Sequence, residues 1–281
     1  QMPLKLMYIT NSEDVAHIAE EAGVDRIFVD MEYLGKTDRQ GGMDTVQSRH
    51  TADDVRRLAQ CLNKAELFVR VNPIHEKTDK YSSSKEEIDE VIEAGADLLM
   101  LPYFKTAEEV QTFVKYVNGR AKTVLLVETP EAAAIAEDLV QIPGIDEMFI
   151  GLNDLSLGYG KNFMFELLLD GTVEELCLKF RKGGIPYGFG GIASLGKGML
   201  PSEYVIKEHY RLGSTCAILS RSFCRTDQVT DLKEIQKIFE TELPKIRELE
   251  EECRVHSEYF WKNRQQVEIK IRQICECEDA K

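Results

Sequence analysis

The chain has 281 residues, of which 43% are hydrophobic and 30% charged, and its net charge is −14. This composition is typical of a globular protein with one large α/β domain or two medium ones. The acidic balance argues against nucleic acid or an anionic membrane as a partner, because both select a basic surface. No apolar run approaches the ~20 residues that a membrane-spanning helix needs.

The seven cysteines are scattered along the chain and show no zinc-site spacing. We therefore expect reduced cysteines, most of them in the core. The first residues, QMPLKLMYIT, do not have the basic, apolar and small-residue pattern of a secretory leader. Both observations favour a cytoplasmic protein.

Short apolar runs alternate with amphipathic segments along the chain. The runs predict strands at residues 4–10, 26–32, 67–72, 98–103, 123–129, 147–152, 186–193 and 216–223. Helical patterns lie between them, at residues 12–22, 52–62, 85–94, 107–117, 130–140, 163–182 and 202–212. Strands that are apolar on both faces and separated by helices pair in parallel.

Eight such units predict an α/β fold of the (β/α)8 (TIM) barrel type, for which ~250 residues are typical. The alternative is an open doubly wound sheet. That fold usually has a glycine-rich loop after its first strand, and MYITNSEDVA is not one. We assign residues 1–229 to a catalytic barrel. Residues 230–281 are assigned to a C-terminal helical extension that packs on the barrel or on a neighbouring subunit.

Polar residues gather at the predicted strand ends, where the βα-loops of a barrel carry its active site. Glu128 ends the fifth strand and Asp154 follows the sixth. An acid there can be a helix cap, but two carboxylates on neighbouring strands repel each other unless a cation lies between them. Carboxylates with open water positions suit Mg²⁺ or Mn²⁺. Arg70, at the end of the third strand, adds a positive charge, and the set favours an anionic, oxygen-rich substrate.

Lysine positions bear on the alternative of an aldolase that forms a Schiff base with its substrate. Lys5 and Lys122 lie at strand starts, and Lys105 and Lys197 lie in loops beyond the strands. None of these lies inside the predicted barrel near a strand end. Metal-stabilised enolate chemistry is therefore favoured over imine chemistry.

Five segments, in chain order, resemble a known family. They are FVDMEY, FVRVN, GADLLMLPYFKTAEEV, LLVETPEA and GIDEMFIGLNDLSLGYG. The chain is similar here to the HpcH/HpaI aldolase and citrate lyase β-subunit family, whose members are metal-dependent barrels of the phosphoenolpyruvate/pyruvate superfamily. The most specific pieces of the resemblance are ET.EA and IG..DLS.

The resemblance implies that Glu128 and Asp154 are metal ligands and that Arg70 contacts the 2-oxo oxygen of a substrate such as pyruvate. The backbone at Leu152, Asn153 and Asp154 matches the turn whose amides hold the substrate carboxylate. The implied reaction makes or breaks a carbon–carbon bond through a pyruvate enolate and uses Mg²⁺ or Mn²⁺.

Some positions depart from the family pattern. Tyr33 stands where family aldolases commonly have a histidine, and Leu126 where a glutamine often precedes the metal-binding glutamate. Glu93 matches a position where some members carry an aspartate of a catalytic dyad. His50, in the long polar loop after the second strand, is a candidate for the missing base, as is a metal-bound water. A solvated loop histidine is the alternative.

We therefore predict a metal-dependent, class II type carbon–carbon lyase that acts on a 2-oxo acid together with an aldehyde or acyl partner. One alternative is a barrel that has lost catalysis and serves as a binding or assembly protein. Others are a phosphoenolpyruvate-using enzyme and a lyase on an acyl-CoA or phosphorylated substrate. A phosphate could bind the glycine-rich GFGGIASLGKG, where Lys197 within the segment and Arg221 after it would supply positive charge. We expect small-molecule partners, no nucleic acid, no membrane, and a homo-oligomer.

Overall fold

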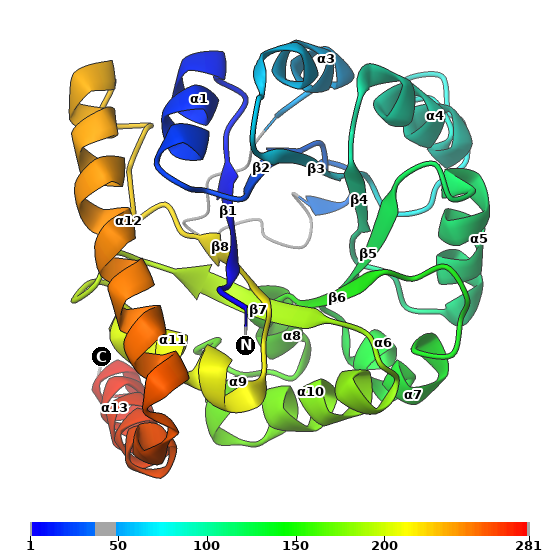
Figure 1. The fold of residues 1–281 in the computed structure, drawn as a ribbon. Helices are drawn as coiled ribbons and strands as arrows, with labels where there is room; N and C mark the ends of the chain where they lie inside the picture. Colours follow the sequence, from blue (N-terminus) through cyan, green and yellow to red (C-terminus); the bar gives the residue numbers. More distant parts are fainter. Residues whose placement is uncertain (1, 37–48, 280–281) are drawn as a thin grey trace.

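The computed structural model describes residues 2–36 and 49–279. Eight parallel strands close into one barrel and follow one another around it in chain order (Figure 1). They are β1 Lys5–Ile9, β2 Arg26–Asp30, β3 Glu66–Arg70, β4 Leu98–Leu101, β5 Lys122–Val127, β6 Glu147–Ile150, β7 Tyr187–Ile192 and β8 Cys216–Leu219. The predicted (β/α)8 barrel is confirmed. The predicted runs extend past the strands at their carboxyl ends, because the chain turns there into the βα-loops.

Helices surround the barrel (Figure 1). They are α1 Glu13–Glu21, α3 Ala52–Cys61, α4 Ser84–Ala94, α5 Ala107–Val117, α6 Pro130–Ala134, α7 Ala136–Leu139, α8 Leu152–Gly158, α9 Glu166–Leu169, α10 Thr172–Lys182 and α11 Ser202–Leu212. The single helices predicted at 130–140 and 163–182 are wrong. The first breaks at Ile135, which leaves helical geometry, and the second breaks before Gly171, whose φ of +86° suits glycine.

Inward-facing side chains fill the barrel. They are Met7, Phe28, Phe68, Leu98, Met100, Val124, Leu126, Phe149 and Cys216. Side chains alternate between the two faces of a strand, so the residues two positions further along β2, β3 and β5 also point inward. These residues are Asp30, Arg70 and Glu128, and all three lie at the carboxyl mouth of the barrel. At the opposite end, Arg26 makes a two-point ion pair with Glu147, with N···O distances of 3.1 and 2.9 Å.

Two long helices follow the barrel, α12 Leu232–Val255 and α13 Phe260–Asp279, with a short 3₁₀ turn between them at Ser257–Tyr259. α12 packs on α1 and α11, and α13 packs on α11 and α9 (Figure 1). α12 thus completes the ring of helices around the barrel, and both helices contact elements of their own chain. The division between residues 229 and 230 stays a prediction.

Within residues 2–36 and 49–279, no helix is long and apolar enough to cross a membrane. This finding agrees with the absence of long apolar runs in the sequence. The cytoplasmic location stays a prediction.

A buried carboxylate ties α12 to the start of β1. Glu250 is 3% exposed and accepts hydrogen bonds from the amide of Leu4 at 2.8 Å and from the hydroxyl of Tyr210 at 2.9 Å. Its second oxygen accepts one from Arg247 at 2.8 Å, and Arg247 also donates to Asp25 at 2.9 Å. Glu250 therefore links α12 to the start of β1 through Leu4 and to α11 through Tyr210.

We predict that Glu250→Gln lowers the free energy of unfolding by about 1–3 kcal/mol, because it leaves buried donors poorly matched. Glu251→Gln is the matched control, since the neighbouring Glu251 is exposed and forms an ion pair with Arg254 on the same helix. Urea unfolding followed by circular dichroism measures both variants. Equal midpoints for the two variants would contradict the role given to Glu250.

Candidate active site

Three cavities meet at the carboxyl mouth of the barrel. The central cavity, of about 210 Å³, is lined by Arg70, Leu126, Glu128, Leu152, Asn153 and Asp154 among others. The side cavity, of about 370 Å³, shares Glu128 and Asp154 with it and reaches Tyr103 and Lys105. The rim cavity, of about 410 Å³, lies at the ends of β1, β2 and β8 and shares Arg70 and Ile218 with the central cavity.

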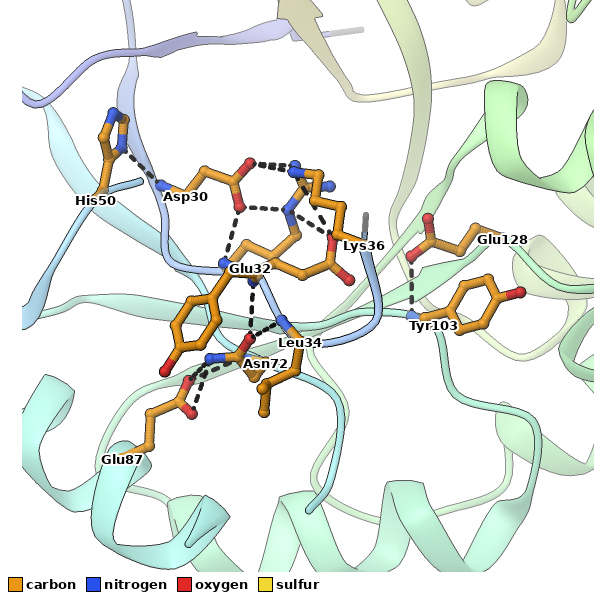
Figure 2. A network of polar contacts seen from close by, with 11 residues as sticks. Asp30, Glu32, Leu34, Lys36, His50, Asn72, Glu87, Tyr103 and Glu128 are labelled. Atoms are coloured by element: carbon orange, nitrogen blue, oxygen red, sulfur yellow. Dashed lines mark hydrogen bonds and ion pairs between the residues drawn. The ribbon is translucent and has the colours of Figure 1, made fainter. Parts of the chain in front are cut away.

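Glu128 is not the cap of the helix that follows it. Thr129 performs that role, since its hydroxyl accepts the amide of Ala132 at 3.1 Å. Glu128 is instead buried at the mouth, where the amide of Tyr103 donates to its Oε2 at 2.9 Å (Figure 2). The bend after β4 that aims this amide gives Tyr103 a φ of +47°.

The chain leaves room for Glu128 directly after β6, because the residue that follows this strand is Gly151. A Cβ on Gly151 would stand 2.9 Å from the Cβ of Glu128 and 3.2 Å from Leu126. Any larger residue at position 151 would therefore push against the carboxylate or the barrel interior.

Asp154 lies in the first turn of α8 and is hydrogen-bonded to Glu128. Burial, the carboxylate of Glu32 and the bond to Asp154 raise the pKa of Glu128 well above its usual range, while Arg70 acts in the opposite direction. The structure therefore brings the two predicted metal ligands together, and their like charges repel each other. Among the described residues, no side chain caps the start of α8, and Leu152 and Asn153 in its first turn line the central cavity.

Arg70 is held by Asp30 in a two-point ion pair. Its Nε lies 2.9 Å from Oδ1 and its terminal nitrogen 2.6 Å from Oδ2. The guanidinium also lies over the ring of Phe28, 5.2 Å from the centroid. Burial alone raises the pKa of Asp30, but Arg70 and Lys36 outweigh it and hold that pKa far below its ordinary value. Arg70 is thus fixed at the boundary between the central and rim cavities.

Lys36 is a buried cation at the same mouth. Its ammonium lies 2.9 Å from Asp30 Oδ2 and 3.9 Å from Glu32 Oε1 (Figure 2). Arg70 Nε is also 3.9 Å from Glu32 Oε1, so the two cations share two carboxylates. The survey of lysines in the sequence missed Lys36, because it follows β2 by six positions and only the folded loop returns it to the barrel. The premise that no lysine lies near the strand ends is therefore wrong.

His50 lies on the far side of Asp30. Its Nδ1 accepts the amide of Asp30 at 3.0 Å (Figure 2), and its own amide donates to the carbonyl of Asp30 at 3.3 Å. Burial lowers the pKa of His50. The positive charge of Lys36 lowers it further, whereas the carboxylates of Asp30 and Asp54 raise it. His50 lines the rim cavity, whereas Glu128 and Asp154 line the other two. Its catalytic role stays a prediction.

A buried amide supports the loop that carries Glu32 and Lys36. Asn72 Oδ1 accepts the amides of Tyr33 and Leu34 at 2.9 and 3.0 Å, and the amide of Asn72 donates to Glu87 at 2.8 Å (Figure 2). The ring of Tyr33, where relatives commonly have histidine, is 42% exposed and packs on Tyr81 with centroids 5.1 Å apart. Tyr33 therefore does not replace that histidine.

Some other residues that the sequence suggested for the site do not join Arg70, Glu128 and Asp154. Glu93 is exposed in the last turn of α4, which lies at the end of the barrel where β4 begins. The match of Glu93 to a catalytic dyad is therefore wrong for this chain. Lys197 and Arg221 line different cavities and do not form one phosphate site. Leu126 is buried at 3% exposure and gives the central cavity an apolar wall.

Comparison with known proteins identifies the family of this chain. The family model described as HpcH/HpaI aldolase/citrate lyase matches residues 5–167, which is more than half of the chain. The match includes Arg70, Glu128 and Asp154. No curated protein matches the chain.

Solved structures share the fold at low sequence identity. An HpcH/HpaI aldolase from Desulfitobacterium hafniense DCB-2 has a TM-score of 0.60 at 15% identity, over 84% of this chain and 93% of that one. An HpcH/HpaI aldolase/citrate lyase family protein from Burkholderia cenocepacia J2315 has a TM-score of 0.61 at 16% identity, over 83% and 95%. A citrate lyase from Burkholderia xenovorans LB400 has a TM-score of 0.55 at 13% identity, over 85% and 77%. The chain belongs to the HpcH/HpaI aldolase/citrate lyase family, a family of lyases.

Proposed function

We propose that this protein is a divalent-metal-dependent carbon–carbon lyase that acts on a 2-oxo acid through its enolate. The observation that carries the proposal is the hydrogen-bonded pair Glu128 and Asp154, which lines one cavity with Arg70. Metal dependence is general in the family. In this chain, metal dependence is supported separately by the excess of negative charge at the mouth of the barrel.

Among the described residues, the charge network that joins Arg70, Lys36 and Glu128 at the mouth contains four carboxylates and two cations. The carboxylates are Asp30, Glu32, Glu128 and Asp154, and the cations are Lys36 and Arg70. A cluster with this excess of negative charge fits a divalent cation, which removes the repulsion that raises the pKa of Glu128. In the described residues, one compact group of three possible metal ligands is found. It consists of His17, Glu20 and Glu21 in the second half of α1. Glu20 there is engaged by the amides of Lys64 and Ala65 at 2.8 and 3.0 Å.

Glu128 and Asp154 would hold the ion, with its remaining positions open to water and substrate. A bound Mg²⁺ or Mn²⁺ supplies Lewis-acid stabilisation of negative charge on a chelating 2-oxo acid. Arg70 orients the same oxygen and stabilises its developing charge from the other side. The first amides of α8, at Leu152 and Asn153, bind the substrate carboxylate.

Apolar side chains complete the central cavity. Leu126, Met100 and Phe149 line its floor, together with the backbone of the barrel end. These groups exclude water from the substrate's reacting carbon, which strengthens each electrostatic contact in the cavity. Leu126 in place of a polar residue makes this floor more apolar, and we expect a correspondingly less polar methyl or methylene group to lie against it.

Lys36 gives imine chemistry a specific place in this barrel, so it is the second candidate. A Schiff base requires an amine that is free to attack the carbonyl carbon, whereas the Lys36 nitrogen is buried and lies 2.9 Å from Asp30 and 3.9 Å from Glu32. The enolate mechanism with a metal is therefore preferred. Borohydride reduction in the presence of pyruvate separates the two, because only an imine leaves a covalent adduct on Lys36.

We predict that the protein exchanges the methyl protons of pyruvate in D₂O when Mg²⁺ or Mn²⁺ is present. Glu128→Gln and Arg70→Lys should each slow this exchange by roughly 10²–10³-fold, because each removes a group that stabilises the enolate. NMR of the methyl signal measures the rate. EDTA should abolish the exchange, and borohydride should leave no adduct.

Glu137→Gln is the matched control for that experiment, since Glu137 is an exposed acid on α7. It should exchange pyruvate as the wild type does. If the wild type exchanges neither pyruvate nor any of several other 2-oxo acids, the enolate mechanism is refuted and a non-catalytic binding role is favoured.

The raised pKa of Glu128 predicts how metal affinity depends on pH. Without metal, the folded protein keeps a proton on Glu128 at pH values where an ordinary glutamate is ionised. Metal binding must release that proton, so affinity should rise as pH increases through the raised pKa. Calorimetric titration with Mn²⁺ in buffers of different ionisation enthalpy measures the release. A binding constant that does not change with pH would contradict the assignment of Glu128 as a ligand.

The same shift has the opposite sign for the stability of the metal-free protein. Because the folded pKa lies above the unfolded value, the contribution of Glu128 is complete below the unfolded pKa and is lost as pH rises through the folded pKa. Glu128→Gln should remove this loss. Unfolding midpoints measured across the pH range in EDTA provide the comparison.

A further inference from the structure

The segment between β3 and α4, residues 71–83, lies at the same end of the barrel as the proposed metal site. Its two ends are tied together. The amide of His75 donates to the hydroxyl oxygen of Ser84 at 2.7 Å, and the amide of Ser84 donates to the carbonyl of His75 at 3.1 Å. Tyr81 of this segment packs on Tyr33, with ring centroids 5.1 Å apart. The segment therefore supports the loop that follows β2.

The ring of His75 lies between two backbone carbonyls. Its Nδ1 is 2.8 Å from the carbonyl oxygen of Pro73, and its Nε2 is 2.8 Å from that of Ser82. A carbonyl oxygen only accepts, so each contact needs an N–H on the ring, and only the protonated imidazole has two. A hydrogen bond from the Ser84 hydroxyl, 3.2 Å from Nδ1, to a neutral ring would leave the Nδ1 lone pair against Pro73. The arrangement therefore fits the protonated ring.

Glu87 connects His75 to Asn72. This carboxylate is 7% exposed, and its Oε2 lies 3.8 Å from His75 Nε2. Glu87 accepts the backbone amide of Asn72 at 2.8 Å and the side-chain amide of Asn72 at 3.3 and 3.2 Å. Because the Asn72 nitrogen points to Glu87, its oxygen is turned the other way and accepts the amides of Tyr33 and Leu34 (Figure 2). Glu87 therefore sets the orientation in which Asn72 holds the loop after β2.

Three other titratable groups belong to this cluster. They are Glu90 on α4, Tyr33 from the loop after β2, and Tyr81 from the segment of His75. Burial raises the pKa of Glu87 and Glu90 adds to that effect, whereas Asn72 and His75 oppose it. Burial and the charge of Glu87 also raise the pKa of Tyr33, which keeps that phenol neutral near neutral pH. In the described part of the chain, His75 is the one cation that forms an ion pair with Glu87.

We propose that His75 is a positioning residue for the enolate site and that it acts in its protonated form. The protonated ring holds both carbonyls of its segment and faces Glu87. Glu87 holds Asn72, and Asn72 holds the two amides that lie between Glu32 and Lys36. When the ring loses its proton, one carbonyl contact and the charge opposite Glu87 are lost together, so the loop that carries Glu32 and Lys36 is held less firmly. The effect on catalysis rests on the proposed function, whereas the effect on the loop does not.

Protonation gives this role a dependence on pH that a purely structural contact does not have. The two contacts are complete when the ring is charged, and one of them is lost as pH rises and the proton leaves. A histidine that only filled space in the segment would support the loop equally at every pH. Comparison of a charged and a neutral replacement for His75 therefore separates the two roles.

The test uses His75→Gln, which is neutral, and His75→Arg, which keeps a positive charge and several N–H donors at every pH. His256→Gln is the matched control, since His256 is an exposed histidine beside Glu258. Hydrogen exchange of the full chain with Mg²⁺ gives the protection of the Tyr33 and Leu34 amides, relative to the unprotected rate at each pH. Methyl exchange of pyruvate in D₂O is measured on the same samples at about pH 6 and about pH 8.5, on either side of the ordinary histidine titration.

Protection of the two amides in the wild type should fall roughly threefold to tenfold from the lower to the higher pH, which is the net effect of about one hydrogen bond. His256→Gln should behave in the same way. His75→Gln should show the lower protection at both pH values, and His75→Arg should show the higher protection at both. The wild-type measurement needs no variant, so it decides the question even if His75→Gln does not fold.

Pyruvate exchange should be roughly tenfold slower in His75→Gln than in the wild type at the lower pH, because a displaced loop misplaces Glu32 and Lys36. This ratio should approach one at the higher pH. The effect of pH on Glu128 is common to both proteins, so the ratio removes it. Wild-type protection that does not change with pH, or a ratio of rates that is the same at both pH values, would overturn the role of His75. Absence of pyruvate exchange in the wild type, with protection changing as expected, would instead refute the proposed function and leave His75 as a support of the loop.

Discussion

The mouth of this barrel depends on the ion pair between Asp30 and Arg70. Asp30 is 2% exposed, and besides Arg70 it binds Lys36 through Oδ2 and the amide of Glu32 through Oδ1. Its backbone binds His50 through both amide and carbonyl. One carboxylate thus fixes the cation that faces the central cavity, the cation that faces the rim cavity, and the start of the loop between them. Removal of one partner from such a buried pair costs about 3–5 kcal/mol, because it leaves an uncompensated charge.

Charge is distributed unevenly in this molecule. The protein as a whole is strongly acidic, yet its two buried cations at the mouth stand together between the cavities. Glu128 and Asp154 lie on one side of them, where burial, Glu32 and the hydrogen bond between the two carboxyl groups raise the pKa of Glu128. The polar rim cavity lies on the other side.

The fold follows from sequence patterns that act over short distances. Alternation of inward and outward side chains in β2, β3 and β5 places Asp30, Arg70 and Glu128 on the inner face, and parallel strands place them at one end. These residues could be found from strand boundaries alone, since each predicted strand begins within one residue of the observed one. The errors occurred where helices break. Ile135 and Gly171 interrupt patterns of apolar residues that remain helical in their spacing, so periodicity could not reveal the breaks.

Loop residues at the site could not be derived in the same way. Asn72, itself held by Glu87, fixes the chain just before Lys36 through contacts between residues 15 to 39 positions apart. His50 is held at the mouth by the backbone of Asp30, 20 positions earlier. The same long-range contacts turn Tyr33 outward, and Tyr103 aims its amide at Glu128 only once β4 and β5 are paired. The sequence by itself determined the barrel and the position of Arg70, Glu128 and Asp154 at its carboxyl mouth, because strand periodicity is a local property. Only the tertiary structure decided that Lys36 joins the site and that Glu93 does not, because the position of a loop or helix end depends on partners distant in the chain.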